Sequence, residues 1–267
     1  MAKSISNFPD LSLRSRTLAI ARFTLLEAWR NRLAWLLVGM VAVAFLVSVF
    51  MRQQAVTEAS RVQLAFLASI VRAGSVFIVA TYVLQGSVRE FHDKVLDLML
   101  SLDLPRSSYL AGKFLGYALL STCCACAVSL PLLLLADPYH VSVWAYTHLL
   151  ELLIVAALAL FCVTTFPQFL SAAAFVLAFY VLARSITAIQ LVSQSTLAPP
   201  GLTADFASFL ANTIALVLPH LDAFAQTAWL VGAPGTPVSM AAATVQSAIY
   251  VTLLLLAAMF DLHRRNF

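Results

Sequence analysis

The sequence contains few charged residues, which make up 10% of its 267 residues, whereas hydrophobic residues make up 62%. Soluble domains contain about 45–50% apolar residues. A chain of this length could bury a sizeable soluble core, but its apolar residues come in blocks of about twenty, the length of a membrane-spanning helix. The composition therefore excludes a soluble globular protein.

The apolar blocks lack the alternation of apolar and polar residues that transmembrane β-strands show over about ten positions. Each block is long enough to cross a hydrocarbon core of about 30 Å as a helix. We therefore predict an all-α, polytopic membrane protein that forms one transmembrane domain over residues 1–267. The six predicted spans are Leu33–Phe50, Val62–Gly86, Phe114–Leu135, Ala145–Phe166, Gln168–Val192 and Met240–Phe260.

Lys and Arg are concentrated on one side of these spans. Twelve of them lie before the first span, between the second and third spans, or after the last span, while only Arg52 and Arg61 lie on the opposite side. Positive charge marks the cytoplasmic side of a membrane protein. Both termini are therefore expected in the cytoplasm, in a cell membrane for which a bacterial inner membrane is favoured. No basic run is interleaved with aromatic residues, so the charge does not indicate a nucleic-acid partner.

A glycine-rich phosphate-binding loop is also missing. At the one Gly112-Lys113 pair, Ser107 replaces the first glycine of the motif and Phe114 replaces the Ser or Thr that follows the lysine. We therefore expect that the chain does not hydrolyse ATP alone. Gly112 and Gly116 form a GxxxG spacing, which permits close helix packing.

The four cysteines lie within the third and fourth predicted spans, which argues against disulfides. Cys123 and Cys126 share a helix face and, with a third thiolate, could hold a soft ion such as Cu(I). The favoured interpretation is that these cysteines are ordinary small apolar residues. His148 and Glu151 do not form a zinc-binding HExxH motif, and no nucleophile–base pair stands out, so we expect neither catalysis nor a bound cofactor.

The segment before the first span, residues 1–32, contains a predicted amphipathic helix over Thr17–Arg32. We expect it to lie in the cytoplasmic interface, with Trp29 at headgroup level, Arg22 and Arg30 toward phosphates and Glu27 on the polar side. The alternative is a simple extension of the first span. No cleavage site follows the first span, which we therefore expect to be retained. The predicted apolar face consists of Leu18, Ala21, Leu25, Ala28 and Trp29.

The longest loop, residues 193–239, lies on the side opposite the termini. It contains two apolar stretches, Phe206–Leu218 and Leu221–Val231, each too short to span a bilayer. We predict short helices that enter the outer leaflet or cap the bundle. The sequence shows no internal repeat, which weakens a reading as an inverted-repeat secondary transporter.

Four ionisable residues fall inside predicted spans: Arg72, His148, Glu151 and Arg184. An unpaired charge at such a depth costs about 2.5–3.5 kcal/mol on insertion scales. We predict that Glu151 pairs with Arg184 or with Arg72. The pair would either fix helix packing or line a translocation route, and the sequence leaves both open.

A charged segment separates the second and third spans within residues 87–113. Seven of the eighteen residues from Arg89 to Arg106 are charged, and the apolar residues among and just before them recur every three or four positions, which predicts an amphipathic cytoplasmic helix. Such a helix is a candidate contact for a soluble partner. Its apolar stripe consists of Val88, Phe91, Val95, Leu98 and Leu102.

Three motifs occur in order along the N-terminal half. Glu27-Ala-Trp-Arg-Asn-Arg32 precedes the first span, Arg89-Glu90 is followed by the Leu-rich run Leu96-Asp-Leu-Met-Leu-Ser-Leu102, and Tyr109-Leu-Ala-Gly-Lys-Phe-Leu-Gly116 begins the third span. They resemble the Glu-x-x-Arg-Asn-Arg, Arg-Glu and Tyr-x-x-Gly-Lys-x-x-Gly motifs of exporter-type ABC transporter permeases with six helices. None of these motifs is catalytic.

The resemblance implies a permease subunit of an ATP-driven transporter. Two copies, as a homodimer or with a related chain, would form the pore in membrane lipid, and two separate ATPase subunits would bind ATP and Mg²⁺. The alternatives are an ion-coupled secondary carrier and a non-transporting membrane assembly subunit, and the substrate stays open. The residues expected to couple to the ATPase are Arg89, Glu90, Phe91, Asp93, Lys94, Asp97 and Leu98.

Overall fold

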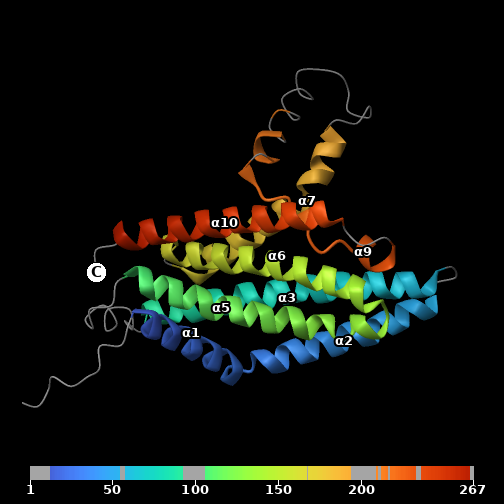
Figure 1. Ribbon diagram of the computed structural model, residues 1–267, viewed down its shortest axis with the longest axis horizontal. Coiled ribbons are helices and arrows are strands. Elements are labelled where there is room, and N and C mark those ends of the chain that lie inside the picture. The colour runs from blue at the N-terminus through green and yellow to red at the C-terminus, as the bar shows by residue number, and fades with distance from the viewer. Residues whose placement is uncertain are drawn as a thin grey trace, which may run out of the picture.

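The computed structural model describes residues 13–54, 58–92, 106–166, 168–193, 209, 212–215, 217–232 and 236–264. Every regular element among these residues is a helix, and most helices run along one long axis (Figure 1). The elements are α1 (Leu13–Arg30), α2 (Leu33–Gln54), α3 (Ala59–His92), α5 (Arg106–Ser129), η1 (Leu132–Leu134), α6 (Pro138–Thr165), α7 (Phe169–Ser193), η2 (Leu221–Ala223), α9 (Ala228–Val231) and α10 (Pro237–Arg264).

Six of these helical segments are long and apolar enough to cross a membrane, which confirms the predicted number and order of spans. The predicted spans lie within or close to the observed ones, because polar residues at the ends continue the helices. The observed spans are Leu33–Gln54, Ala59–Glu90, Ser107–Leu134, Pro138–Thr165, Phe169–Leu191 and Ser239–Arg264.

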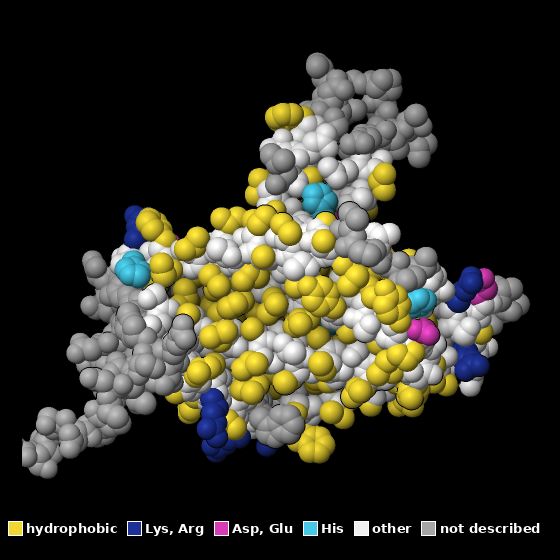
Figure 2. All heavy atoms as spheres, in the orientation of Figure 1, with side chains coloured by type: hydrophobic (Ala, Val, Ile, Leu, Met, Phe, Trp, Pro, Cys, Tyr) yellow, Lys and Arg dark blue, Asp and Glu magenta, His cyan; other side chains and the backbone are white. Residues whose placement is uncertain are grey.

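Helix α6 forms the centre of the bundle. In its most apolar window 83% of the residues are buried, whereas the corresponding share for α10 is 17%. Hydrophobic side chains cover the middle of the molecule, and charged side chains gather toward its two ends (Figure 2). This arrangement suits a helix bundle with lipid around its middle, because exposed apolar side chains there do not meet water.

Helix α1 is separate from α2. The chain turns at Asn31 and Arg32, and Arg32 has φ of 59°, in the left-handed region that L-residues rarely adopt. A simple extension of the first span, one of the two alternatives for this segment, is therefore wrong. The position of α1 relative to a lipid surface stays a prediction.

Helix α1 packs against α5 through small residues. A Cβ added at Gly116 would lie 2.7 Å from Cβ of Thr24, and one added at Gly112 would lie 3.0 Å from Cβ of Ile20. The GxxxG motif of α5 therefore permits close packing, and the helix that packs against it is α1. On the predicted apolar face of α1, Ala21 and Ala28 are buried while Leu18 is 64% exposed, so a contact of Leu18 with lipid stays a prediction. The two glycines meet Ile20 and Thr24, which lie outside that predicted face.

Replacement of Gly116 by Ala is expected to destabilise the protein by about 1–3 kcal/mol, because the added methyl group overpacks the contact with Thr24. The matched control is Gly39→Ala in α2, where a Cβ would meet no atom within 4 Å. The control is expected to be neutral or to stabilise by up to about 1 kcal/mol through helix propensity. Thermal unfolding of the detergent-solubilised protein measures both, and equal midpoints would contradict the assigned contact.

Candidate functional site

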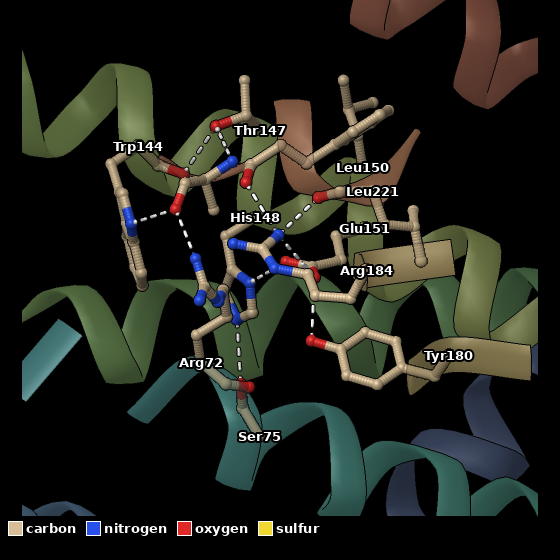
Figure 3. A network of polar contacts seen from close by, with 12 residues as sticks. Arg72, Ser75, Trp144, Thr147, His148, Leu150, Glu151, Tyr180, Arg184 and Leu221 are labelled. Carbon is tan, nitrogen blue, oxygen red and sulfur yellow. Dashed lines mark hydrogen bonds and ion pairs between the residues drawn. The ribbon is translucent and has the colours of Figure 1, made fainter. Parts of the chain in front are cut away.

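A cluster of polar side chains lies buried between α3, α6, α7 and the segment of residues 218–225 (Figure 3). Helix α6 contributes one face of the cluster, because residues three or four apart on a helix point the same way. Side chains from α3 and α7 approach this face, and the 218–225 segment contributes backbone groups. The side chains are Arg72 and Ser75 from α3, Trp144, Thr147, His148 and Glu151 from α6, and Tyr180 and Arg184 from α7.

Glu151 is fully buried, and its carboxylate is bound from three directions. Oε1 accepts hydrogen bonds from the Tyr180 hydroxyl at 3.0 Å and from Nη1 of Arg184 at 3.4 Å. Oε2 lies 3.2 Å from Nδ1 of His148. The predicted pairing of Glu151 with Arg184 is therefore confirmed. A buried carboxylate needs such partners, because its desolvation costs several kcal/mol.

His148 connects the carboxylate to α3. Its Nε2 lies 2.9 Å from Oγ of Ser75, and its ring stacks on Trp144 with centroids 5.0 Å apart. Sequence reasoning found no nucleophile–base pair, and the structure brings one together across 73 residues. Ser75, His148 and Glu151 have the connectivity of a Ser–His–acid triad. All three side chains are fully buried, so the arrangement suits proton exchange or helix pairing better than attack on a large substrate.

The two arginines bind backbone carbonyl groups of the 218–225 segment. Arg184 donates from Nη1 to the carbonyl oxygens of Leu221 and Phe224, the latter at 3.0 Å. Arg72 donates from Nη1 to the carbonyl oxygen of Ala225 at 2.7 Å. Arg72 thus binds the backbone carbonyl group of Ala225 rather than Glu151, the alternative partner that the sequence left open. The cluster has two guanidinium groups but only one carboxylate. The carbonyl dipoles of the 218–225 segment stabilise the positive charge that Glu151 does not neutralise.

Ala225 is held at every polar backbone atom. Besides Arg72, its carbonyl oxygen accepts a hydrogen bond from Nε1 of Trp144 at 3.1 Å, and its N–H donates to Oγ1 of Thr147 at 3.2 Å. Its φ of 45° lies in the left-handed region, which costs an alanine about 1–2 kcal/mol. Backbone strain of this kind persists where the surroundings over-determine the conformation. The 218–225 segment is therefore fastened to the bundle by hydrogen bonds that oppose its own conformational preference.

A second polar contact joins the ends of α3 and α5. Oε2 of Glu90 accepts a hydrogen bond from the Tyr109 hydroxyl at 2.7 Å, and Oε1 pairs with Nζ of Lys113. The Lys113 side chain is only 3% exposed and the Glu90 side chain 13%. Behind them, Ser87 and Tyr117 share a hydrogen bond at 2.9 Å. The Glu90 carboxylate is thus bound by two side chains of α5.

The other residues of the predicted coupling segment are only partly described. Arg89 is exposed on α3, and Phe91 belongs to the last turn of the same helix, with its side chain outside the description. Asp93, Asp97 and Leu98, like Lys94, lie outside the described residues. Their predicted role in docking stays a prediction.

The residues predicted for the interfacial helix lie on α1. Arg22 and Arg30 are exposed and Glu27 is half-buried, while the side chain of Trp29 lies outside the description. This distribution keeps the charged groups at the surface of the bundle. It leaves the predicted contact with lipid phosphates untested.

The cysteines are free thiols. Cys123 and Cys126 are exposed on α5, whereas Cys124 and Cys162 are buried. The hypothetical soft-metal site required a third ligand, and within the described part of the chain no group of three His, Cys, Asp or Glu side chains is placed to hold a metal ion.

Comparison with known proteins adds no family to this description, because no family model and no curated protein matches the chain.

Replacement of Glu151 by Gln is expected to destabilise the folded protein by about 3–5 kcal/mol, since Arg184 loses the only carboxylate that it contacts among the described residues. Tyr180→Phe is the matched control. It removes one hydrogen bond to the same carboxylate and is expected to cost about 1.5–3 kcal/mol. Reversible unfolding in mixed micelles compares the two variants.

The double charge swap Glu151→Arg with Arg184→Glu is not expected to restore stability. A carboxylate at position 184 would face the carbonyl oxygens that Arg184 now binds. Recovery of wild-type stability in the double variant would contradict this account of the cluster.

Proposed function

We propose that the chain is the permease subunit of an ATP-driven ABC transporter that exports its substrate. Two copies, or one copy with a related chain, form the translocation path in a cell membrane with both termini in the cytoplasm. Two separate ATPase subunits bind ATP and Mg²⁺ and dock on the charged segment within residues 87–113. The sequence motifs and the distribution of Lys and Arg support this assignment of sides and partners.

The observation that carries the proposal is the continuity of α3. This single helix holds Arg72 and Ser75 in the buried cluster and Glu90 in the contact with α5. Fifteen residues separate Ser75 from Glu90, which corresponds to about 22 Å along the helix axis. A displacement at the Glu90 end is therefore transmitted to the cluster by one rigid element.

The charged segment overlaps the last turn of this helix and continues beyond it. Residues 93–105 connect α3 to α5, and the contact of Glu90 with Lys113 holds those two helix ends together. The start of α1 and the end of α10 lie at the same end of the bundle as the start of α5 (Figure 1). An ATPase that binds residues 93–105 would push on a paired helix end rather than on a loose loop.

The remaining parts fit a permease with a closed outer side. Helix α1 would lie in the cytoplasmic interface, where its exposed Arg22 and Arg30 meet phosphates. The 218–225 segment and α9 would cap the bundle in the outer leaflet. Exposed apolar residues of α2 and α10, such as Leu46 and Phe260, supply surface for lipid or for the second permease.

Simultaneous replacement of Phe91 and Leu98 by Asp is expected to abolish copurification of the ATPase from the native membrane. Two carboxylates in the apolar stripe would oppose its burial against a partner. Membrane insertion should persist, because both residues lie beyond the apolar core of their spans. Copurification is measured by affinity isolation followed by mass spectrometry.

The matched control is Arg61→Asp, which adds a carboxylate at the opposite end of the bundle, where Arg61 and Glu58 form an exposed ion pair. This variant is expected to keep its ATPase. An ATPase that remains bound to the Phe91→Asp, Leu98→Asp variant contradicts coupling through this segment. Wild-type protein that carries no ATPase favours the ion-coupled carrier or the assembly subunit.

Lys113→Met is expected to leave the ATPase bound but to weaken transmission from it. The substitution keeps the aliphatic stem and removes the charge that holds Glu90. In the isolated complex, ATP should change hydrogen exchange in residues 218–225 of the wild type, and this change should shrink several-fold in the variant. An unchanged response would exclude the Glu90–Lys113 contact from the transmission.

A further inference from the structure

The hydroxyl group of Ser75 has two acceptors and one proton. Its Oγ lies 2.9 Å from Nε2 of His148 and 2.9 Å from the carbonyl oxygen of Arg72, one turn earlier on α3. A serine hydroxyl donates one hydrogen bond and accepts others. It can therefore donate to only one of these two groups at a time, and the direction of its bond with His148 depends on the protonation of the imidazole.

Both protonation states of His148 satisfy every polar atom in this chain of contacts. In the neutral state Nδ1–H donates to Glu151, and Nε2 accepts the proton of Ser75. In the cationic state both ring nitrogens donate, to Glu151 and to Oγ of Ser75, and the serine proton turns to the Arg72 carbonyl. A proton is gained without loss of a hydrogen bond.

We propose that Ser75, His148 and Glu151 form a proton-binding site that controls the attachment of the 218–225 segment to the bundle. The occupant is a single proton on the imidazole. A buried network of hydrogen bonds stabilises the fold when every polar atom has a partner and destabilises it when one does not. A site that stays satisfied in both states is suited to bind and release a proton in the interior.

The charged groups around His148 determine what the bound proton does. Glu151 contacts it on α6, Arg72 approaches from α3, and Tyr180 and Arg184 approach the same carboxylate from α7. A proton on His148 places a third cation around one carboxylate. The imidazolium then shares the single negative charge of Glu151 with Arg184, which binds the other carboxylate oxygen, and like charge repels both guanidinium groups.

Neighbouring elements supply no other counter-charge at this point among the described residues. Helices α5 and α10 also pack on α6, but Lys113 binds Glu90, Tyr250 binds the Val217 carbonyl and Asp261 binds Thr165. On the 218–225 segment itself, Asp222 has a buried Oδ1 without a hydrogen-bond partner among the described residues, and His220 is half-buried.

Protonation consequently weakens the attachment of the 218–225 segment. Arg184 holds the Leu221 and Phe224 carbonyl groups, and Arg72 holds the Ala225 carbonyl. Displacement of either guanidinium frees backbone that already carries the left-handed strain of Ala225. Low pH therefore opens this side of the bundle and high pH closes it. The mechanism requires only this chain and does not depend on an ATPase.

The test measures how fast a water-soluble maleimide reaches two cysteines introduced into the full-length purified protein. Ala225→Cys reports the held position, where the native side chain is 0% exposed, and Ala223→Cys reports an exposed position of the same segment. The ratio of the two rates cancels the pH dependence of the thiol reaction. Peptide mass spectrometry separates these sites from the natural cysteines, and Leu221→Cys, at 1% exposure, repeats the measurement at a second held position.

The ratio of the Ala225→Cys rate to the Ala223→Cys rate is expected to rise about tenfold between pH 8 and pH 5. This factor corresponds to the loss of about one hydrogen bond to a charged group. A ratio that is independent of pH at both held positions overturns the proposal.

Two variants assign the effect to the site. His148→Gln, which keeps polar atoms but cannot take the charge, is expected to abolish the pH dependence. If that variant does not fold, Ser75→Ala serves instead, and the pH at which the ratio rises is expected to change because Nε2 of His148 loses its hydrogen-bond partner on α3. Wild-type pH dependence in His148→Gln, or in Ser75→Ala where that variant is the one measured, overturns the role of the site.

Discussion

The burial of the Glu151 carboxylate at the centre of the bundle is the constraint on which most of the structure depends. Helix α6 has the largest buried share among the described membrane-spanning helices, so a charge on its inner face is shielded from water. The partners of the carboxylate tie two neighbouring helices to α6. Arg184 and Tyr180 place α7, and His148 connects to Ser75 on α3. Apolar contacts between helices in lipid are weakly directional. The polar cluster therefore supplies the specificity that apolar packing lacks.

The contact between α1 and the two glycines of α5 attaches α1 to the bundle. Helix α1 carries exposed arginines and lies outside the core, so it needs attachment without a large apolar face. Gly112 and Gly116 allow its backbone to approach within van der Waals contact of α5. The Glu90–Lys113 contact then closes the same end between α3 and α5. Two kinds of interaction, close backbone packing and a nearly buried ion pair, thus hold the end from which residues 93–105 emerge.

Hydropathy predicted the six spans because the length of an apolar block is a direct physical requirement of the bilayer. The pairing of Glu151 with Arg184 was also predictable, since both residues lie at similar depth and an unpaired charge there is costly. Ser75 was not predictable as a partner of His148, because a serine inside a span carries no signal of its own. The left-handed Ala225 gave no signal either, since glycine is the residue that normally marks such a conformation. Helix periodicity also did not reveal that Ile20 and Thr24 of α1 would be the residues that contact the two glycines.

The two ends of the proposed transmission use different chemistry, and the difference has a consequence for sequence variation. At the Glu90 end both partners are side chains, so a substitution of either one breaks the contact. At the 218–225 segment the arginines bind carbonyl oxygens, which every residue type possesses. The guanidinium contacts themselves thus do not depend on the side chains of this segment, whereas the buried side chains of Leu221, Phe224 and Ala225 are constrained by packing. The identity of the cluster residues is constrained by the buried charge, whereas the segment they hold is constrained by the path of its backbone and by the packing of its buried side chains.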